Sequence, residues 1–253
     1  MKLSERHEYI LDKVKALGHI YVSELSEELQ VSPVTIRKDL TVLEDRDLLF
    51  RTHGGASLQN PYIREKRVSE KIHLNYPEKL KIAKKAREMV KPGDSLLIGS
   101  GTTLSIFANQ IKNINDLTVV TSSLQVALDL TDNPTNNIII LGGTLRNTSA
   151  SSIGMIAEQM LDQYVCSKLF LSVDGIDVQR GMTTASTYEA SLNRRMIQSA
   201  DKLIALVDST KIGKISIGKI GAIQSIDCLI MDRPESESTI QEWNSFGFTV
   251  NWV

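Results

Sequence analysis

Residues 31–40 have the sequence VSPVTIRKDL, which predicts a turn followed directly by the start of a helix. Ser32 belongs to the residue types that cap helix N-termini, and Pro33 suits a first helical turn because the N–H that it lacks would have no partner there. Three apolar residues then recur at i, i+4 and i+7 and define one buried face: Ile36, Leu40 and Leu43. We therefore expect a helix from Pro33 to about Asp45.

Two further helices are predicted upstream. Leu25 and Leu29 are four residues apart and give a short helix at residues 22–30 an apolar ridge. Residues 4–17 carry apolar residues at helical spacing, with Gly18 as a stop. A short helix, a break and a second helix form the pattern of a helix-turn-helix, whose second helix enters the major groove of DNA. Taken alone, the pattern also occurs in helical domains that bind no DNA.

The predicted second helix carries polar residues away from its apolar face. Lys38 lies opposite that face and Arg37 lies on its flank. In helices of this kind Arg and Lys reach phosphates or guanine edges. Ser32 and Thr35, at the helix start, are short polar residues that suit contacts with the phosphate backbone. These four residues are therefore candidates for contacts with double-stranded DNA.

Residues 48–56, with the sequence LLFRTHGGA, predict a β-ribbon. Gly54 and Gly55 can supply the positive φ that a tight turn between two strands needs. On such a ribbon, Arg51 and His53 would reach a phosphate or the minor groove. Together with the three helices, the ribbon completes a small winged unit over residues 1–57.

The stretches VSPVTIRKDL and LFRTHGGA, at residues 31–40 and 49–56, resemble the N-terminal signature of the DeoR family of bacterial repressors. That family usually has two arginines where this chain has Arg37 and Lys38. The resemblance implies a winged helix-turn-helix domain that binds operator DNA. The candidates for DNA contact are Ser32, Pro33, Thr35, Arg37, Lys38, Arg51, His53, Gly54 and Gly55.

Charge is distributed unevenly along the chain. Residues 1–57 carry eight Lys/Arg against ten Asp/Glu, whereas residues 58–91 carry ten against four and the rest eleven against sixteen. The basic segment at 58–91 would add salt-dependent phosphate contacts beside the winged unit. The alternative is a solvated linker and helix face.

Length and cysteine content limit the remaining possibilities. The 253 residues allow a domain at 1–57, a linker at 58–78 with a hinge near residues 59–61, and a larger domain at 79–253. Cys166 and Cys228 are the only cysteines and lack metal-ligand spacing, so we expect no disulfide framework, no metal and no cofactor. No apolar run is long enough to cross a bilayer, and no secretory leader is recognisable, so a cytoplasmic location is expected.

The larger domain alternates apolar runs with helical patterns. The predicted strands are residues 95–98, 117–120, 137–141, 168–173, 202–207 and 228–231. The predicted helices are residues 80–89, 103–111, 124–130, 153–160 and 185–200. Continuous apolar strands separated by helices predict an α/β fold with a mostly parallel sheet, whose ligands bind at the carboxyl ends of the strands.

The loops after the predicted strands carry small and polar residues. Gly99–Thr103 follows one strand and opens a helix, so its N–H groups and hydroxyls can surround an anion. Similar loops follow the next strands: Thr121–Ser123, Gly142–Gly143, Asp174–Gly175 and Asp208–Lys211. Each loop alone is also ordinary turn chemistry. Five of them at one sheet edge predict a ligand site.

The same loops resemble the sensor domain of the DeoR family, which is similar in fold to ribose-5-phosphate isomerase and the CoA-transferases. The resemblance implies a phosphorylated sugar effector, with the loop at 101–103 on phosphate, Asp174 on sugar hydroxyls and Lys211 on an anionic group. The family commonly has Asp where this chain has Gly99. The candidates for effector contact are Gly99, Ser100, Gly101, Thr102, Thr103, Thr121, Ser122, Ser123, Gly142, Gly143, Asp174, Gly175 and Lys211.

Two functions from different classes remain open at this stage. The first is a DNA-binding regulator, active as a homodimer or homotetramer, whose affinity for operator DNA changes when a phosphorylated sugar binds. The second is a working sugar-phosphate isomerase with an appended DNA tether, in which Asp174, Asp208 and Lys211 would supply the carboxylate base and the electrophile. A recognition helix and wing have no use in an isomerase, so we expect a regulator and no catalytic residues.

Overall fold

The computed structural model describes residues 3–45, 48–52, 54–57, 68–234 and 236–253. The chain divides into two compact units, residues 1–65 and residues 66–253, each considered by itself below. The predicted hinge at residues 59–61 and the candidate His53 lie outside the described residues.

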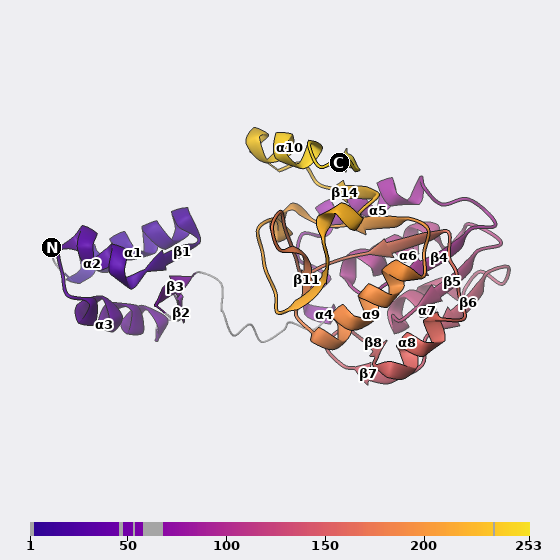
Figure 1. The fold of residues 1–253 in the computed structure, drawn as a ribbon, viewed down its shortest axis with the longest axis horizontal. Coiled ribbons are helices and arrows are strands. Elements are labelled where there is room, and N and C mark those ends of the chain that lie inside the picture. The colour runs from indigo at the N-terminus through magenta and orange to yellow at the C-terminus, as the bar shows by residue number, and fades with distance from the viewer. Residues whose placement is uncertain (1–2, 46–47, 53, 58–67, 235) are drawn as a thin grey trace. The chain divides into compact units, whose positions relative to one another are not determined.

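The first unit is a small winged helical domain (Figure 1). Its elements are α1 (Leu3–Leu17), β1 (His19–Tyr21), α2 (Val22–Leu29), α3 (Pro33–Glu44), β2 (Phe50–Thr52) and β3 (Gly55–Ser57). The strands form an antiparallel sheet in the order β1-β3-β2. The predicted apolar ridge of α3 packs into a core with α1, α2 and the sheet: Ile10, Val14, Ile20, Val22, Leu25, Ile36, Leu40, Leu43, Leu49 and Ala56.

The second unit is built on a seven-stranded sheet in the order β15-β14-β12-β9-β4-β5-β6. Every neighbouring pair in it is parallel, which confirms the predicted fold class. The strands are β4 (Ser95–Ile98), β5 (Thr118–Thr121), β6 (Asn137–Ile140), β9 (Lys168–Leu171), β12 (Leu203–Leu206), β14 (Cys228–Met231) and β15 (Thr249–Trp252). Strand β15 was not predicted from the sequence, because polar and apolar residues alternate in it and form no continuous apolar run.

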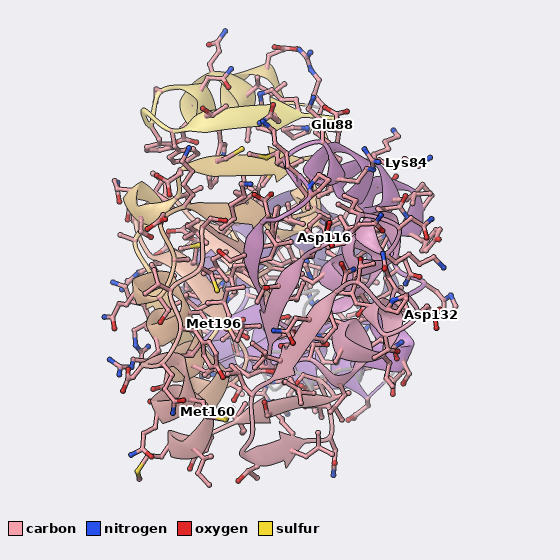
Figure 2. The ribbon with its side chains drawn as sticks, turned by 90° about the vertical axis from the view of Figure 1, so that its right-hand side faces the viewer. Lys84, Glu88, Asp116, Asp132, Met160 and Met196 are labelled. Atoms are coloured by element: carbon pink, nitrogen blue, oxygen red, sulfur yellow. The ribbon has the colours of Figure 1, made fainter. Side chains whose placement is uncertain are left out.

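Helices cover both faces of this sheet (Figure 1). The helices are α4 (Val68–Lys71), α5 (Tyr76–Arg87), α6 (Thr102–Ile111), α7 (Leu124–Leu130), α8 (Met155–Leu161), α9 (Thr187–Gln198) and α10 (Glu237–Asn244). One core contains residues of α5, α6 and α7, and the other contains residues of α8, α9 and α10. In Figure 2, Lys84 and Glu88 mark the solvent side of α5.

Short elements complete the second unit. A hairpin of β7 (Thr144–Arg146) and β8 (Ser151–Ile153) follows β6, and β10 (Gly175–Asp177), β11 (Gly181–Thr184) and β13 (Gly218–Gly221) form a separate antiparallel sheet. Two 3₁₀ turns lie at Ser209–Lys211 and Ile223–Ser225. The sequence did not predict these pieces, because three or four residues carry too little periodicity.

The structure differs from the predicted linker at residues 58–78. Residues 68–71 are helical, and α5 begins at Tyr76 rather than near Leu80. Pro77 occupies the first turn of α5, where it costs no hydrogen bond, and Lys79 is already buried. The C-terminal part of the predicted linker therefore belongs to the second unit.

Within the described ranges, no helix has the length and apolar character needed to cross a membrane. The same residues contain no group of three or more His, Cys, Asp or Glu placed to hold a metal ion.

Candidate functional site

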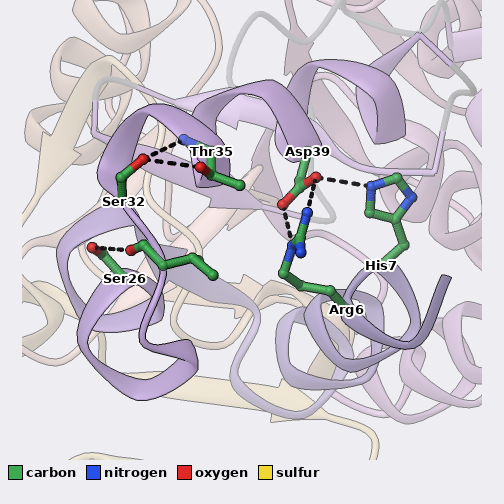
Figure 3. Close-up of polar contacts among 7 residues, drawn as sticks. Arg6, His7, Ser26, Ser32, Thr35 and Asp39 are labelled. Carbon is green, nitrogen blue, oxygen red and sulfur yellow. Dashed lines mark hydrogen bonds and ion pairs between the residues drawn. The ribbon is translucent and has the colours of Figure 1, made fainter. Parts of the chain in front are cut away.

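The start of α3 is capped as predicted. The Thr35 N–H donates to Ser32 Oγ at 3.1 Å, and the hydroxyls of Ser32 and Thr35 share a hydrogen bond of 2.9 Å (Figure 3). Ser26 Oγ donates to the Val31 carbonyl at 2.7 Å and fixes the turn between α2 and α3. The angle at which α3 leaves α2 is therefore set by side-chain hydrogen bonds.

A buried carboxylate on α3, which the sequence analysis missed, ties this helix to α1. Asp39 is 3% exposed; its two oxygens accept from Arg6 Nε at 2.6 Å and Arg6 Nη2 at 3.0 Å, and it also pairs with His7 Nε2 at 3.2 Å (Figure 3). Burial alone would raise the pKa of Asp39, but the hydrogen bonds from Arg6 and His7 outweigh it and lower that pKa. The carboxylate is thus ionised and holds α1 against α3.

The two predicted recognition residues of α3 are exposed. Arg37 and Lys38 immediately precede the buried Asp39, and their side chains lie in solvent while Ile36 and Leu40 are buried. An exposed pair of cations beside a rigidly held helix start is the arrangement that reads a DNA groove.

Arg51 of the wing is tied to α3. Its Nη1 donates to Thr41 Oγ1 at 3.1 Å, and its backbone N–H donates to Glu44 Oε1 at 2.9 Å. Thr41 Oγ1 in turn donates to the Arg37 carbonyl at 2.9 Å. Arg51 therefore fixes the wing to the helix, a role that leaves its guanidinium half-buried.

The two wing glycines have different roles. Gly54 has a φ of 105° and open space around its Cα, as a turn residue requires. Gly55 is buried, and a Cβ there would lie 1.9 Å from the Ile20 carbonyl oxygen. Gly55 is glycine because β1 and β3 pass closely, and its contacts lie within the domain.

In the second unit, the loops after β4 and β9 meet at the point where the strand order reverses. The chain runs from β4 outward through β5 to β6 and then returns to β9 on the other side of β4. The Gly99 N–H donates to the Phe170 carbonyl at 3.0 Å, and a Cβ on Gly101 would lie 3.8 Å from Ser172 Cβ. Such a reversal opens a crevice at the carboxyl ends of the strands.

The α6 N-terminus lies where the strand order reverses. Gly101 has a φ of 133°, a conformation that L side chains rarely adopt, and Thr102 and Thr103 directly follow it and are buried. The first amides of a helix have no carbonyl partner within it and attract anions. The loop 99–103 therefore has the features predicted for a phosphate cradle.

The hydroxyls after β5 have structural partners. Ser123 Oγ accepts from the Val126 N–H and caps α7, and Thr121 Oγ1 accepts from the Ser123 N–H at 3.1 Å. The Ser122 carbonyl accepts from the Ser152 N–H at 2.8 Å, which joins this loop to β8. Thr121 and Ser123 are therefore already used in holding the loop.

Asp174, at the end of β9, is surrounded by donors that the sequence analysis did not identify. Its Oδ1 accepts from Lys71 Nζ at 3.1 Å, and its Oδ2 accepts from Thr184 Oγ1 at 2.9 Å and the Ala185 N–H at 3.0 Å. Burial opposes ionisation, but the Lys71 charge and these hydrogen bonds together lower the pKa of Asp174. Asp174 is an ionised, oriented hydrogen-bond acceptor.

Lysines gather around Asp208, at the end of β12. Lys79 of α5 is only 4% exposed; burial lowers its pKa, Asp208 raises it, and Lys211 and Lys71 lower it further. Burial, together with Lys211, also lowers the pKa of Lys214. Positive charge therefore exceeds negative charge at this end of the sheet, as an anion site requires.

Sequence did contain a signal for Lys79. On α5, Lys79 shares a face with the buried Ile82, Ala83 and Ala86 at i, i+3, i+4 and i+7. A lysine on the apolar face of a helix is rarely buried without a partner or a function.

The remaining candidate glycines pack against the chain itself. The Gly142 N–H donates to Met160 Sδ at 3.1 Å, and a Cβ on Gly143 would lie 2.6 Å from the Ile153 carbonyl oxygen. A Cβ on Gly175 would lie 2.2 Å from the Lys214 carbonyl oxygen. Gly143 and Gly175 therefore need glycine for close backbone passage.

Asp208 also borders a pocket of about 220 Å³. Asn75 Nδ2 donates to Asp208 Oδ1 at 3.2 Å and to Thr210 Oγ1 at 3.3 Å. Ser209 donates through its N–H and its hydroxyl to Asp232. The 3₁₀ turn that carries Lys211 is therefore held by hydrogen bonds from Asn75 and to Asp232.

Two family models match the chain. Residues 6–61 match the DeoR-like helix-turn-helix domain, and residues 74–233 match the DeoR C-terminal sensor domain. Among solved structures, a ribose 5-phosphate isomerase A from Methanocaldococcus jannaschii is similar to 55% of this chain, with 18% identity and a TM-score of 0.41, and the match spans 55% of that isomerase.

Relatives resemble the chain over nearly its whole length. A protein of Escherichia coli O157:H7, provisionally named an aga operon transcriptional repressor, is 38% identical over 90% of this chain and 86% of its own. The lactose phosphotransferase system repressor of Lactococcus lactis is 34% identical over 97% of both chains, and the glycerol-3-phosphate regulon repressor of Escherichia coli K12 is 32% identical over 95% of both. The family expected from the sequence is confirmed, and the chain belongs to the DeoR family of transcriptional regulators.

Proposed function

We propose that the protein is a sequence-specific DNA-binding repressor of a carbohydrate operon and acts in the cytoplasm. Binding of a phosphorylated sugar or sugar alcohol weakens or strengthens its affinity for operator DNA. The relatives described above are named as repressors of the lactose phosphotransferase system and of the glycerol-3-phosphate regulon, which supports a target of this kind.

The observation that carries DNA binding is the geometry of α3. Its apolar face is fully buried, its start is capped by Ser32, and Arg37 and Lys38 are exposed on the first two turns. A helix fixed in this way enters a groove without a further cost for ordering its backbone. Operator contacts from Ser32, Pro33, Thr35, Arg37 and Lys38 follow from that placement.

Effector binding is supported by three groups at the carboxyl end of the sheet. The α6 N-terminus and the cations Lys79 and Lys211 suit a phosphate, while the ionised Asp174 suits sugar hydroxyls. Lys79 joins the set proposed from sequence because its buried ammonium lies among other cations. Gly101, Thr102 and Thr103 then hold the phosphate, and Asp174 selects the sugar.

A sugar-phosphate isomerase is the second candidate, because Asp174 is a carboxylate in a ligand crevice. Its lowered pKa makes it a weak general base, since proton abstraction is most efficient when the pKa lies near the working pH. A repressor without catalysis fits the crevice better.

The test is a titration of the chain on DNA from its own upstream region. Titrations without ligand are compared with titrations in glycerol 3-phosphate, ribose 5-phosphate and several hexose 6-phosphates, with unphosphorylated sugars as controls. Specific binding that one phosphorylated compound shifts is the expected result. Turnover of any of these compounds in a coupled isomerase assay would instead favour the second candidate.

A further inference from the structure

Helix α4 is the first described element of the second unit, and no side chain of it is fully buried. It comprises Val68–Lys71. By contrast, α5 buries Ile82, Ala83 and Ala86 in the core. Because α4 is a single turn whose only apolar side chain, Val68, is half-buried, polar contacts contribute much of what holds it in place.

Among the described residues, three polar contacts join α4 to the rest of the second unit. The Val68 N–H donates to the Thr148 carbonyl at 2.8 Å, Lys71 Nζ donates to Asp174 Oδ1 at 3.1 Å, and Lys79 Nζ donates to the Lys71 carbonyl at 2.9 Å. Two of the three partners, Asp174 and Lys79, are groups that the proposed effector uses. The docking of α4 and the binding of effector therefore draw on the same side chains.

The contacts compete for defined atoms. Asp174 Oδ2 already accepts from Thr184 and Ala185, so a sugar hydroxyl must bind at Oδ1, where the Lys71 ammonium lies. A phosphate beside Lys79 attracts that ammonium away from the Lys71 carbonyl. A ligand that makes both interactions weakens two of the three contacts of α4.

We propose that the Lys71–Asp174 ion pair is a latch that the effector opens. With the site empty, the latch is closed and α4 is docked; with a sugar phosphate on Asp174 and Lys79, α4 is released. Residues 58–67 join α4 to the DNA-binding unit in sequence, so release of α4 moves the first docked helix of the second unit from α4 to α5. The ligand shifts this equilibrium because it binds the open state more tightly. This inference rests on the proposed function of the crevice.

The first arm of the test needs no ligand. Hydrogen exchange at the amides of Ile72 and Leu74, which donate to α4 carbonyls, is measured in the full-length wild type and in Lys71→Met. Exchange should rise on the order of five-fold in Lys71→Met, as expected for loss of a partly exposed ion pair. Lys81→Met removes an equal charge from the exposed side of α5 and should leave this exchange unchanged. Equal exchange in Lys71→Met and the wild type overturns the latch.

The second arm uses the sugar phosphate from the panel above that shifts DNA binding. It should raise exchange at the same amides in the wild type, and Lys71→Met should bind it several-fold more tightly, because no latch has to open first. Ligand-free Lys71→Met should also move toward the operator affinity of the loaded wild type.

Weaker binding of the sugar phosphate by Lys71→Met shows Lys71 to be a ligand contact and overturns the latch, while the proposed function stands. If no compound of the panel binds the wild type, the proposed effector fails, and with it the switching role, whatever the first arm shows.

Discussion

The guanidinium of Arg6 on α1 forms two hydrogen bonds with the carboxylate of Asp39 on α3, at 2.6 and 3.0 Å. The residues are 33 positions apart, and both side chains are almost excluded from solvent. Asp39 follows Arg37 and Lys38 directly, so this ion pair sets the orientation of the recognition residues.

Asp39→Asn should destabilise the DNA-binding unit by about 1 to 3 kcal/mol, because Arg6 is left without its charged partner. The measurement is the lower-temperature transition in thermal unfolding of the full chain. Asp45→Asn, which changes an exposed carboxylate just after α3, is the matched control and should leave that transition in place.

The same ion pair should give the unit an acid-sensitive stability. The folded pKa of Asp39 lies below its unfolded value, so its contribution is complete above about pH 4 to 5 and is lost as pH falls through the folded pKa. As the pH falls from about 5 through the folded pKa of Asp39, the free energy of unfolding, measured with urea, should decrease more in the wild type than in Asp39→Asn. Parallel curves would show that folding does not lower the pKa of Asp39.

Arg37→Ala and Lys38→Ala should each weaken operator binding roughly ten-fold or more, since one good base contact contributes about 1 to 3 kcal/mol. Both side chains are exposed, so thermal unfolding should not change. Lys15→Ala removes an exposed cation from α1 and is the control for charge alone. Operator affinity that both α3 variants retain would remove α3 from the interface.

Lys79→Met should abolish the response to the sugar phosphate while the ligand-free protein stays at least as stable. Burial lowers the pKa of Lys79, so loss of this charge should not destabilise the ligand-free protein, and methionine fits the apolar face of α5. Differential scanning fluorimetry with and without ligand measures both effects. Lys81→Met on the exposed side is the control, and a normal response in Lys79→Met would place the phosphate elsewhere.

Operator binding should require two half-sites on one face of the duplex. Residues 1–57 carry more Asp and Glu than Lys and Arg, so one copy should bind weakly and a homodimer or homotetramer should bind repeated half-sites about one helical turn, or a multiple of it, apart. Insertion of about 5 base pairs between half-sites should therefore reduce affinity strongly, and about 10 should restore part of it. Light scattering that shows a monomer on DNA would contradict this.

Local signals were sufficient for much of the molecule. Ser32, Pro33 and the ridge of Ile36, Leu40 and Leu43 predicted the start, the cap and the buried face of α3, and all were found. Apolar runs likewise located six of the parallel strands. These features depend on residues within about four positions of one another. They can be predicted because side chains repeat with a fixed period along a helix or a strand.

Contacts between distant residues could not be predicted in this way. Asp39 is an ordinary polar residue in sequence and becomes the anchor of α1 only when Arg6 is brought beside it. Gly55 was predicted to lie in the turn, whereas it lies in β3, where a Cβ would be 1.9 Å from the Ile20 carbonyl oxygen.

What the sequence alone determined is the set of elements, their buried faces and the loops that carry polar groups, because helix and strand propensity act over a few residues. What only the tertiary structure decided is which of those groups meet. Lys71 and Asp174 lie 103 positions apart, and the charge of Asp208 acts on Lys79 of α5, so these groups meet only once the parallel sheet has assembled. A parallel sheet aligns strand ends that are distant in the chain, and no local pattern encodes that alignment.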